Sequence, residues 1–334
     1  MWFEKLTGFR EESPEQVRAN FEIKSSILTS LVNGKSWNFG KLEVPTLQEL
    51  RQQVNAITEL PKGNIEVVEV VGNVQTFHAN EGNKNALFQA ASQFNLLEMV
   101  GPEVTPERGV GIYSLDYTQG PACAIACGAG TIYRNYFAPV NGKLGQTRGN
   151  QIDCLQDIGE ALQNKELGLW TMRNGYALAN KQGLKNIAAQ VKALTPDEYE
   201  DLKGKLRIGL QWDTEVTINE HKQRVSQAYC SALPVAYSLL DKSLWEAFAR
   251  LVLEATYEAT LAAGVINLAQ TGCNKVFLTL VGGGAFGNDT IWITDAIKKA
   301  VKKFEGVGLD VRLVSYGRSD KVVKRLINEI HQGL

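Results

Sequence analysis

The chain has 334 residues, of which 44% are hydrophobic and 21% charged, and its formal net charge is -1. This length and composition are typical of one large folded α/β domain or two modest ones. The near-zero net charge gives no electrostatic sign of a nucleic-acid or anionic-membrane partner. The charged N-terminus does not resemble a signal peptide, and no run approaches eighteen apolar residues, so we expect a cytoplasmic protein.

The five cysteines are odd in number and stand mostly among small apolar residues, which is typical of reduced, buried thiols. Cys123 and Cys127 are four residues apart, but no nearby Cys or His completes a metal site, and the chain has only three histidines. We therefore predict neither a metal nor a cofactor.

The first sixty residues contain two helix-start signals. Ser13-Pro14-Glu15-Gln16 places a capping residue before a proline at the first helical position, and Thr46 followed by Glu49 is a capping-box pattern. We predict an N-terminal helical extension over residues 1–60, packed on a main domain over 61–334.

The main domain is predicted to alternate strands and helices. Residues 64–71 are rich in valine and predict a strand, whereas 85–99 have roughly helical spacing of apolar residues. Residues 109–115 predict a short strand, Asp116 to Gly120 a turn, and Pro121 the start of a helix of small residues.

The later part continues this alternation. Residues 205–212 predict a strand ending at Asp213-Thr214-Glu215, and 276–281 and 309–316 predict two further strands with a helix between them. The pattern indicates a three-layer α/β/α fold with a mixed, mostly parallel sheet. Ligands of such sheets bind at the carboxyl ends of the strands, so we expect the turns at 116–120, 213–215 and 282–288 to converge on one crevice.

The glycine-rich segment 282–288 follows a buried strand and precedes a helix. Glycines allow a tight turn with N–H groups exposed to a ligand, and the following helix N-terminus adds partial positive charge, so the segment predicts a phosphate cradle. Gly282, Gly284 and Gly287 also match the dinucleotide fingerprint, but it comes late in the chain and no acid ends the next strand. A turn needed only for strand-to-helix packing remains the alternative.

The motif VGGGAFGND, with Ala228-Tyr229-Cys230-Ser231 before it and a strand ending at Tyr316 after it, resembles macrodomains of the poly(ADP-ribose) glycohydrolase type. This resemblance implies a macrodomain-like fold that binds ADP-ribose. Phe286 would lie beside the ribose and diphosphate, and Tyr316 is a candidate for stacking on adenine. The diphosphate would be wrapped by Gly282, Gly283, Gly284, Ala285, Phe286, Gly287 and Asn288.

The family's catalytic pair of glutamates is missing. Its best counterpart is Gln93-Phe94-Asn95-Leu96, before Glu98, and an asparagine cannot protonate a leaving group. Four segments, SQFNLLEM, DYTQGPA, WDTEVT and VSQAYCSALPVAYS, are similar to the bacterial-effector branch that removes ADP-ribose from arginine, including ubiquitin arginine. The resemblance therefore implies ADP-ribose and an ADP-ribosylated protein as partners.

Cleavage of an N-glycosidic bond to ribose passes through an oxocarbenium-like transition state. The enzyme needs carboxylates to orient the attacking water and to share the charge of this state. We predict Asp213 and Glu215 for the arginine and the water, with Asp116 positioning the ribose or the same water. Each of these acids is equally explained as a turn or cap residue.

The polar residues suited to hold ADP-ribose are Gln93 and Asn95, for ribose hydroxyls, and Gln119 and Gly120, for a backbone N–H to phosphate. The sequence thus predicts an ADP-ribosyl hydrolase that acts on N-glycosyl bonds, most readily on ADP-ribosylarginine. The two alternatives are a non-catalytic ADP-ribose-binding module and a Rossmann-type NAD-dependent enzyme.

Overall fold

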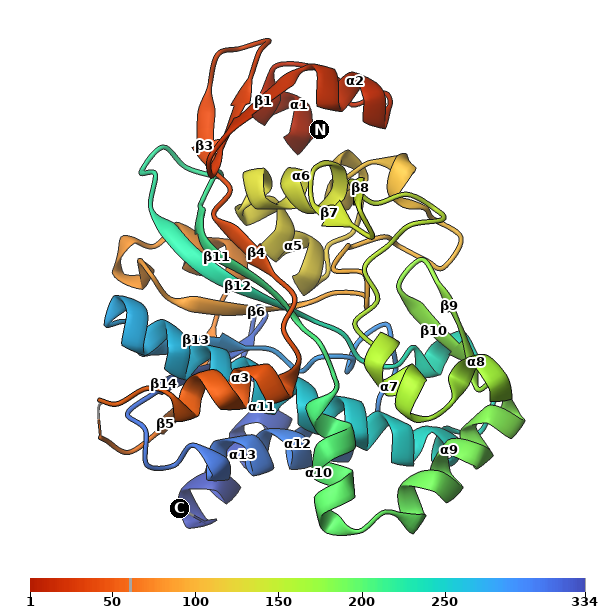
Figure 1. The fold of residues 1–334 in the computed structure, drawn as a ribbon. Coiled ribbons are helices and arrows are strands. Elements are labelled where there is room, and N and C mark those ends of the chain that lie inside the picture. The colour runs from red at the N-terminus through yellow and green to blue at the C-terminus, as the bar shows by residue number, and fades with distance from the viewer. Residues whose placement is uncertain (60–61, 334) are drawn as a thin grey trace.

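A mixed seven-stranded sheet organises the computed structural model, which describes residues 1–59 and 62–333 (Figure 1). The β12, β6, β13, β14 and β5 strands run parallel to one another, whereas β11 is antiparallel to both of its neighbours, β4 and β12. The predicted mixed, mostly parallel sheet is confirmed. In spatial order the strands are β4 (Lys41–Glu43), β11 (Gly209–Glu215), β12 (Arg224–Cys230), β6 (Leu87–Ala91), β13 (Lys275–Leu278), β14 (Asp310–Ser315) and β5 (Glu66–Val71).

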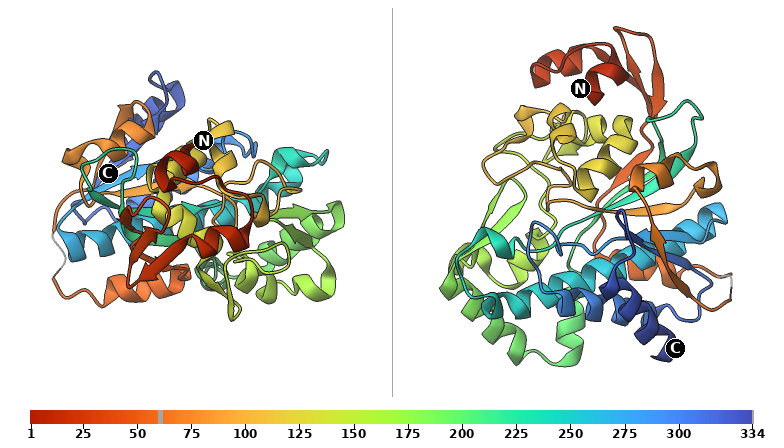
Figure 2. Two further views of the ribbon diagram at one scale, coloured as in Figure 1. Left: turned by 90° about the horizontal axis from the view of Figure 1, so that it is seen from above. Right: turned by 180° about the vertical axis from the view of Figure 1, so that it is seen from behind.

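Helices cover both faces of the sheet. On one face the long helix α11 packs against β6, β12 and β13, with further helices around it; the other face carries α5 and α6, with α4 packed on α5 (Figures 1 and 2). The helices of the first face are α3 (Leu47–Asn55), α9 (Lys181–Ala193), α10 (Pro196–Gly204), α11 (Glu246–Thr271), α12 (Thr290–Lys303) and α13 (Lys321–Gly333). Those of the second are α4 (Val74–Ala79), α5 (Gln119–Ala126) and α6 (Gly128–Tyr136).

The α11 helix is apolar around most of its circumference because it is enclosed by the sheet and by other helices. It is the one helix of the described residues that is long and apolar enough to cross a membrane, yet the whole apolar window is buried inside the fold. Its apolar character is therefore explained by its place in the core.

The N-terminal segment has a small architecture of its own. It contains α1 (Trp2–Thr7), α2 (Pro14–Ala19) and an antiparallel sheet of β1 (Phe21–Lys24), β2 (Ile27–Ser30) and β3 (Ser36–Asn38). Its buried side chains share a second hydrophobic core with α6. The division at residue 60 stays a prediction, although β4, on its N-terminal side, joins the large sheet.

Two predicted elements are wrong. The segment 85–99 forms β6 and then a loop, because β6 is buried on both faces and shows no alternation that would distinguish it from a helix. Its buried Gln89 donates from Nε2 to Thr260 Oγ1 on α11 at 2.8 Å, which satisfies a polar residue inside the sheet. The predicted strand 109–115 is instead the 3₁₀ helix η3 (Gly111–Leu115).

Short elements complete the chain. They are η1 (Glu81–Asn83), η2 (Pro106–Arg108), β7 (Pro139–Val140), β8 (Lys143–Leu144), α7 (Gln156–Ala161), α8 (Asn164–Leu167), β9 (Trp170–Arg173), β10 (Tyr176–Ala179), η4 (Val235–Tyr237) and η5 (Lys242–Trp245).

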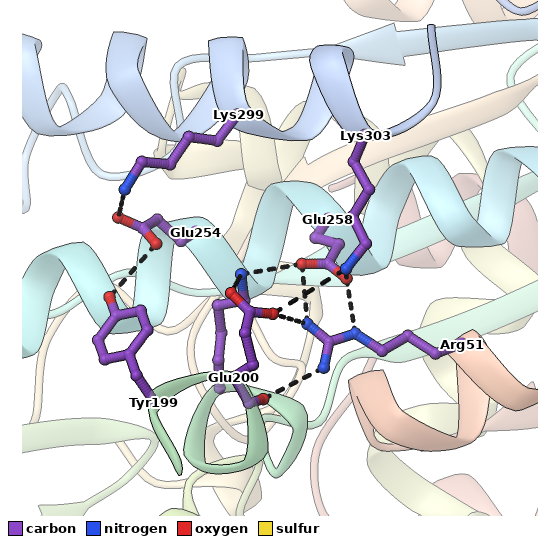
Figure 3. A network of polar contacts seen from close by, with 8 residues as sticks. Arg51, Tyr199, Glu200, Glu254, Glu258, Lys299 and Lys303 are labelled. Atoms are coloured by element: carbon purple, nitrogen blue, oxygen red, sulfur yellow. Dashed lines mark hydrogen bonds and ion pairs between the residues drawn. The ribbon is translucent and has the colours of Figure 1, made fainter. Parts of the chain in front are cut away.

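A charge network fastens the helices of the first face together (Figure 3). Glu258 of α11 accepts from Arg51 Nε of α3 at 2.6 Å and from Lys303 of α12. Arg51 also reaches Glu200 of α10, whose carboxylate binds Lys203 at 2.6 Å. Burial opposes ionisation, but the hydrogen bonds from Arg51 and Lys303 and the charge of Lys203 lower the pKa of Glu258 to about 2.

Candidate functional site

A cavity of about 660 Å³ opens at the carboxyl ends of β6, β13, β14 and β5. This is the position expected for a ligand of a parallel sheet. Its lining comes from the loop after each of these strands, from the start of α5 and from Trp2 of α1. Glu98 and Asp116 are the carboxylic acids of the described lining, which contains no lysine or arginine.

The glycine loop forms one wall of the cavity through Gly282, Gly284, Ala285 and Phe286. Gly282 has φ of +79°, and a Cβ there would lie 2.4 Å from Ala232 Cβ, so the turn requires glycine. Gly283, Gly287 and Asn288 do not line the cavity. Asn288 is buried and its Nδ2 donates to Leu233 O at 2.8 Å, which anchors the loop.

The helix that supplies N–H groups to the cavity is α5 rather than α12. Asp289 caps α12 by accepting from Ile291 N at 3.0 Å, and the start of α12 does not line the cavity. At α5 the residues from Thr118 to Ala122 line the cavity, and the side chain of Thr118 does not cap the helix. The first N–H groups of a helix have no intrahelical partners, so α5 directs donors and partial positive charge into the cavity.

Gln119 and Gly120, at this helix start, both line the cavity, but the side chain of Gln119 is already engaged and Gly120 has none. The Gln119 amide accepts from Ala91 N at 2.8 Å and donates to Gln89 O at 2.7 Å, which ties α5 to β6. A Cβ on Gly120 would lie 2.0 Å from Ala91 O. Their backbone N–H groups are therefore the parts available to a ligand.

Glu98 is the most unusual side chain of the cavity. It is 2% exposed, its Oε1 has no hydrogen-bond partner among the described residues, and a Cβ on Gly120 would lie 2.3 Å from its Oε2. Burial raises the pKa of Glu98 well above its usual range, the charge of Asp116 raises it further, and Arg134 opposes both. The environment of Glu98 therefore favours the neutral, protonated carboxyl group inside a ligand-sized cavity.

Asp116 also lines the cavity. It follows η3 rather than a strand, and its Oδ1 accepts from Thr118 N at 2.8 Å, which shapes the turn into α5. Two carboxyl groups therefore share this cavity, one buried and one at a turn.

Asp213 and Glu215 do not line this cavity, so the predicted convergence of three turns is wrong. Because β11 is antiparallel to β12, the carboxyl end of β11 lies beside the amino end of β12, at the end of the sheet away from the cavity. Asp213, in a bulge with φ of +52°, is 57% exposed and pairs with Arg224 at 2.7 Å. Glu215 accepts from Asn38 N at 3.0 Å and so fastens the N-terminal segment to β11.

The two predicted amides occupy different places. Gln93 lines the cavity, and its Oε1 accepts from Met99 N at 2.9 Å. Asn95 is fully buried outside the lining, where its Nδ2 donates to Gln151 Oε1 at 2.9 Å. Both amides therefore stabilise the loop that carries Glu98, and only Gln93 borders the cavity.

Aromatic side chains stand at several points of the cavity. Tyr316, after β14, is 80% exposed and lines it. Phe286 packs with Tyr176 and Tyr237, with ring centroids 5.3 and 5.6 Å away, and all three line the cavity. Such a cluster offers apolar faces to a sugar or a base.

Sequence patterns did not lead to four residues of the cavity lining, Glu98, Tyr176, Tyr237 and Trp2. Glu98 carried a usable signal, because it is a single acid in the apolar run Leu96-Leu97-Glu98-Met99. The other three come from elements distant in sequence, and no local pattern marks them.

No protein-family model and no curated protein sequence matches the chain. Among solved structures, the chain is similar to poly(ADP-ribose) glycohydrolase from Thermomonospora curvata bound to the inhibitor ADP-HPD. The TM-score is 0.47 and the identity 11%, over 96% of each chain. It is also similar to poly(ADP-ribose) glycohydrolase from Deinococcus radiodurans in complex with ADP-ribose, with a TM-score of 0.42 and 9% identity over 88% of this chain and 95% of that one.

Proposed function

We propose that this chain binds ADP-ribose in the cavity and hydrolyses the bond between its distal ribose and a protein side chain. The observation that carries the proposal is Glu98, a buried carboxyl group with a raised pKa and an unpartnered Oε1, in a cavity that also presents backbone N–H groups. A general acid can protonate a leaving group, and backbone N–H groups can bind a phosphate. Together they suit hydrolysis of a glycosidic bond in a nucleotide sugar.

The binding half of the proposal rests on the two walls of the cavity. The backbone of the loop at Gly282 to Phe286 and the start of α5 supply donors for a diphosphate. Phe286 and its aromatic neighbours suit the distal ribose, and Tyr316 suits the adenine. The volume of about 660 Å³ is in the range of small-molecule sites.

The chemical half divides the work between two carboxyl groups. Glu98 would give its proton to the departing group as the bond to ribose C1 breaks, and Asp116 would orient the water that attacks C1 and accept the proton that this water loses. The products are ADP-ribose and the unmodified side chain. Glu98 provides the acid that Asn95 cannot, so this assignment favours hydrolysis over a binding-only module.

Arginine is the side chain that we propose first, because Asp116 offers a carboxylate to a guanidinium at the cavity. The motif resemblance supports the same choice and makes ADP-ribosylated ubiquitin a reasonable substrate to test. A cytoplasmic location agrees with five cysteines that are all free.

Two experiments test the proposal. In calorimetric titrations, ADP-ribose should bind, and binding of NAD without binding of ADP-ribose would favour the NAD-dependent alternative. The protein is then incubated with arginine-ADP-ribosylated protein, and release of ADP-ribose is measured by mass spectrometry. Binding with no release from arginine-, serine- or glutamate-linked substrates would favour the non-catalytic module.

A further inference from the structure

The N-terminal segment supplies the partners for the backbone at the start of η3. Glu11 accepts from Val110 N at 2.9 Å and from Gly111 N at 2.6 Å, and it also accepts from the Tyr136 hydroxyl at 2.6 Å. Trp2 Nε1 donates to Val110 O at 3.0 Å. Both polar backbone groups of Val110 are thus held by residues that lie more than ninety positions earlier.

The middle of η3 reaches the backbone of the candidate acid. Tyr113 of η3 is fully buried, and its hydroxyl oxygen accepts from the backbone N–H of Glu98 at 3.0 Å. Ser114 and Asp116, at the end of the same short helix, line the cavity. A chain of direct contacts therefore runs from Glu11 through η3 to the backbone of Glu98.

Trp2 also takes part in the cavity itself. It lines the cavity beside η3, and a Cβ on Gly128 would lie 2.6 Å from Trp2 Cζ3, so the indole packs directly on the start of α6. Figures 1 and 2 show the N-terminal segment lying over α5 and α6, away from the helices of the first face.

We propose that the N-terminal segment is a working part of the site. Trp2 contacts the bound ligand or its leaving group, and Glu11 and Tyr113 are positioning residues that set the place of Glu98 through η3. This inference rests on the proposed function, in which Glu98 is the acid. A displacement of the acid by about 1 Å costs roughly 100-fold in rate, so loss of either contact should lower turnover more than it lowers affinity.

The test uses the full chain with Glu11→Gln and Tyr113→Phe, each with a matched control. The controls are Glu15→Gln, an exposed acid of the same segment, and Tyr133→Phe, a tyrosine that stacks on Phe39. For each variant kcat on arginine-ADP-ribosylated protein, Kd for ADP-ribose and the urea unfolding midpoint are measured. We expect kcat to fall about 10- to 100-fold in both test variants, with Kd largely unchanged, and to stay unchanged in the controls.

Trp2→Leu separately tests the proposed contact between Trp2 and the bound ligand. It removes the contact with the ligand together with the hydrogen bond to Val110 O, so it should raise the Kd for ADP-ribose, whereas Glu11→Gln and Tyr113→Phe should not. The unchanged Kd of the Glu11 and Tyr113 variants reports that the cavity is folded, so a fall in kcat then has a positional cause. Turnover like that of the controls in both variants would overturn this inference alone. An unaltered chain that neither binds nor cleaves ADP-ribose compounds would instead overturn the proposed function.

Discussion

Replacing Glu98 by glutamine tests whether this side chain is a protonated acid. Above pH 4.5, the ordinary pKa of a glutamate, the unfolded chain has lost this proton while the folded chain keeps it, because burial raises the folded pKa. The folded state then binds more protons than the unfolded state, so its stability falls as pH rises. Glutamine has no such penalty, and Glu98→Gln should therefore be stabilising at neutral pH and not in acid.

The size of the effect follows from the linkage relation. Each pH unit over which only the folded chain holds the proton costs about 1.4 kcal/mol, so the three units between pH 4.5 and about 7.5 set an upper limit of about 4 kcal/mol. The charge of Arg134 opposes the effect of burial, so we expect a measured difference below this limit.

The assay is urea unfolding of the unaltered chain and of Glu98→Gln at about pH 4.5 and about pH 7.5. The difference between the two pH values is the quantity of interest, because any effect of the amide that does not depend on pH cancels. Glu12→Gln, at an exposed position, is the control and should show no such difference. An equal stability change at both pH values for Glu98→Gln would refute a raised pKa.

The same variant should lose hydrolysis by roughly 10²- to 10⁴-fold, which is the usual contribution of a general acid, while it retains ADP-ribose binding. In the unaltered chain, kcat should fall as pH rises through the raised pKa of Glu98, because the acid is then deprotonated. Full turnover by Glu98→Gln would remove the acid from the proposed mechanism.

Three further outcomes are expected. Gly284→Val should fold normally, since nothing lies within 4 Å of a Cβ there, and should weaken ADP-ribose binding in calorimetry. Gly282→Val should instead lower the unfolding midpoint, because the φ of Gly282 is +79°. Asp213→Asn should leave hydrolysis unchanged and shift the free energy of unfolding by less than about 1 kcal/mol, since it affects an exposed pair with Arg224 and a long hydrogen bond of 3.5 Å from Asn38 Nδ2. A large loss of turnover would return Asp213 to the mechanism. Glu258 has a lowered pKa, so its stabilising contribution is complete above pH 4.5 and is lost as pH falls toward about 2, and acid unfolding of Glu258→Gln should therefore be less steep than that of the unaltered chain over this range.

The sequence predicts the elements whose signals are local. The β13 strand, the glycine loop and α12 follow one another directly, so periodicity and glycine spacing are enough to recognise them. The same holds for the helix that begins at the Thr46 capping box, which is present in the structure. The class of fold and one wall of the cavity were accessible in this way.

No local sequence pattern predicts whether a strand is parallel or antiparallel to its neighbours. Alternation along 205–212 shows that β11 is a strand, but its antiparallel pairing with β12 is a property of the assembled sheet. The prediction for Asp213 failed for this reason. The loop that carries Glu98 is likewise shaped by distant partners, with Phe94 N bonded to Gly175 O and Asn95 to Gln151.

The described cavity lining contains no lysine or arginine, so substitutions during evolution cannot remove a basic side chain from the anion-binding wall. Among point substitutions only one to proline deletes a backbone N–H group, and these groups have no rotamers to be ordered when a ligand arrives. Any other substitution alters this wall through shape, by adding a Cβ where glycine now stands or by moving the loop. Anion binding by this wall thus depends little on side-chain chemistry. Selectivity for the ligand can change through substitutions of the aromatic and carboxyl side chains around it.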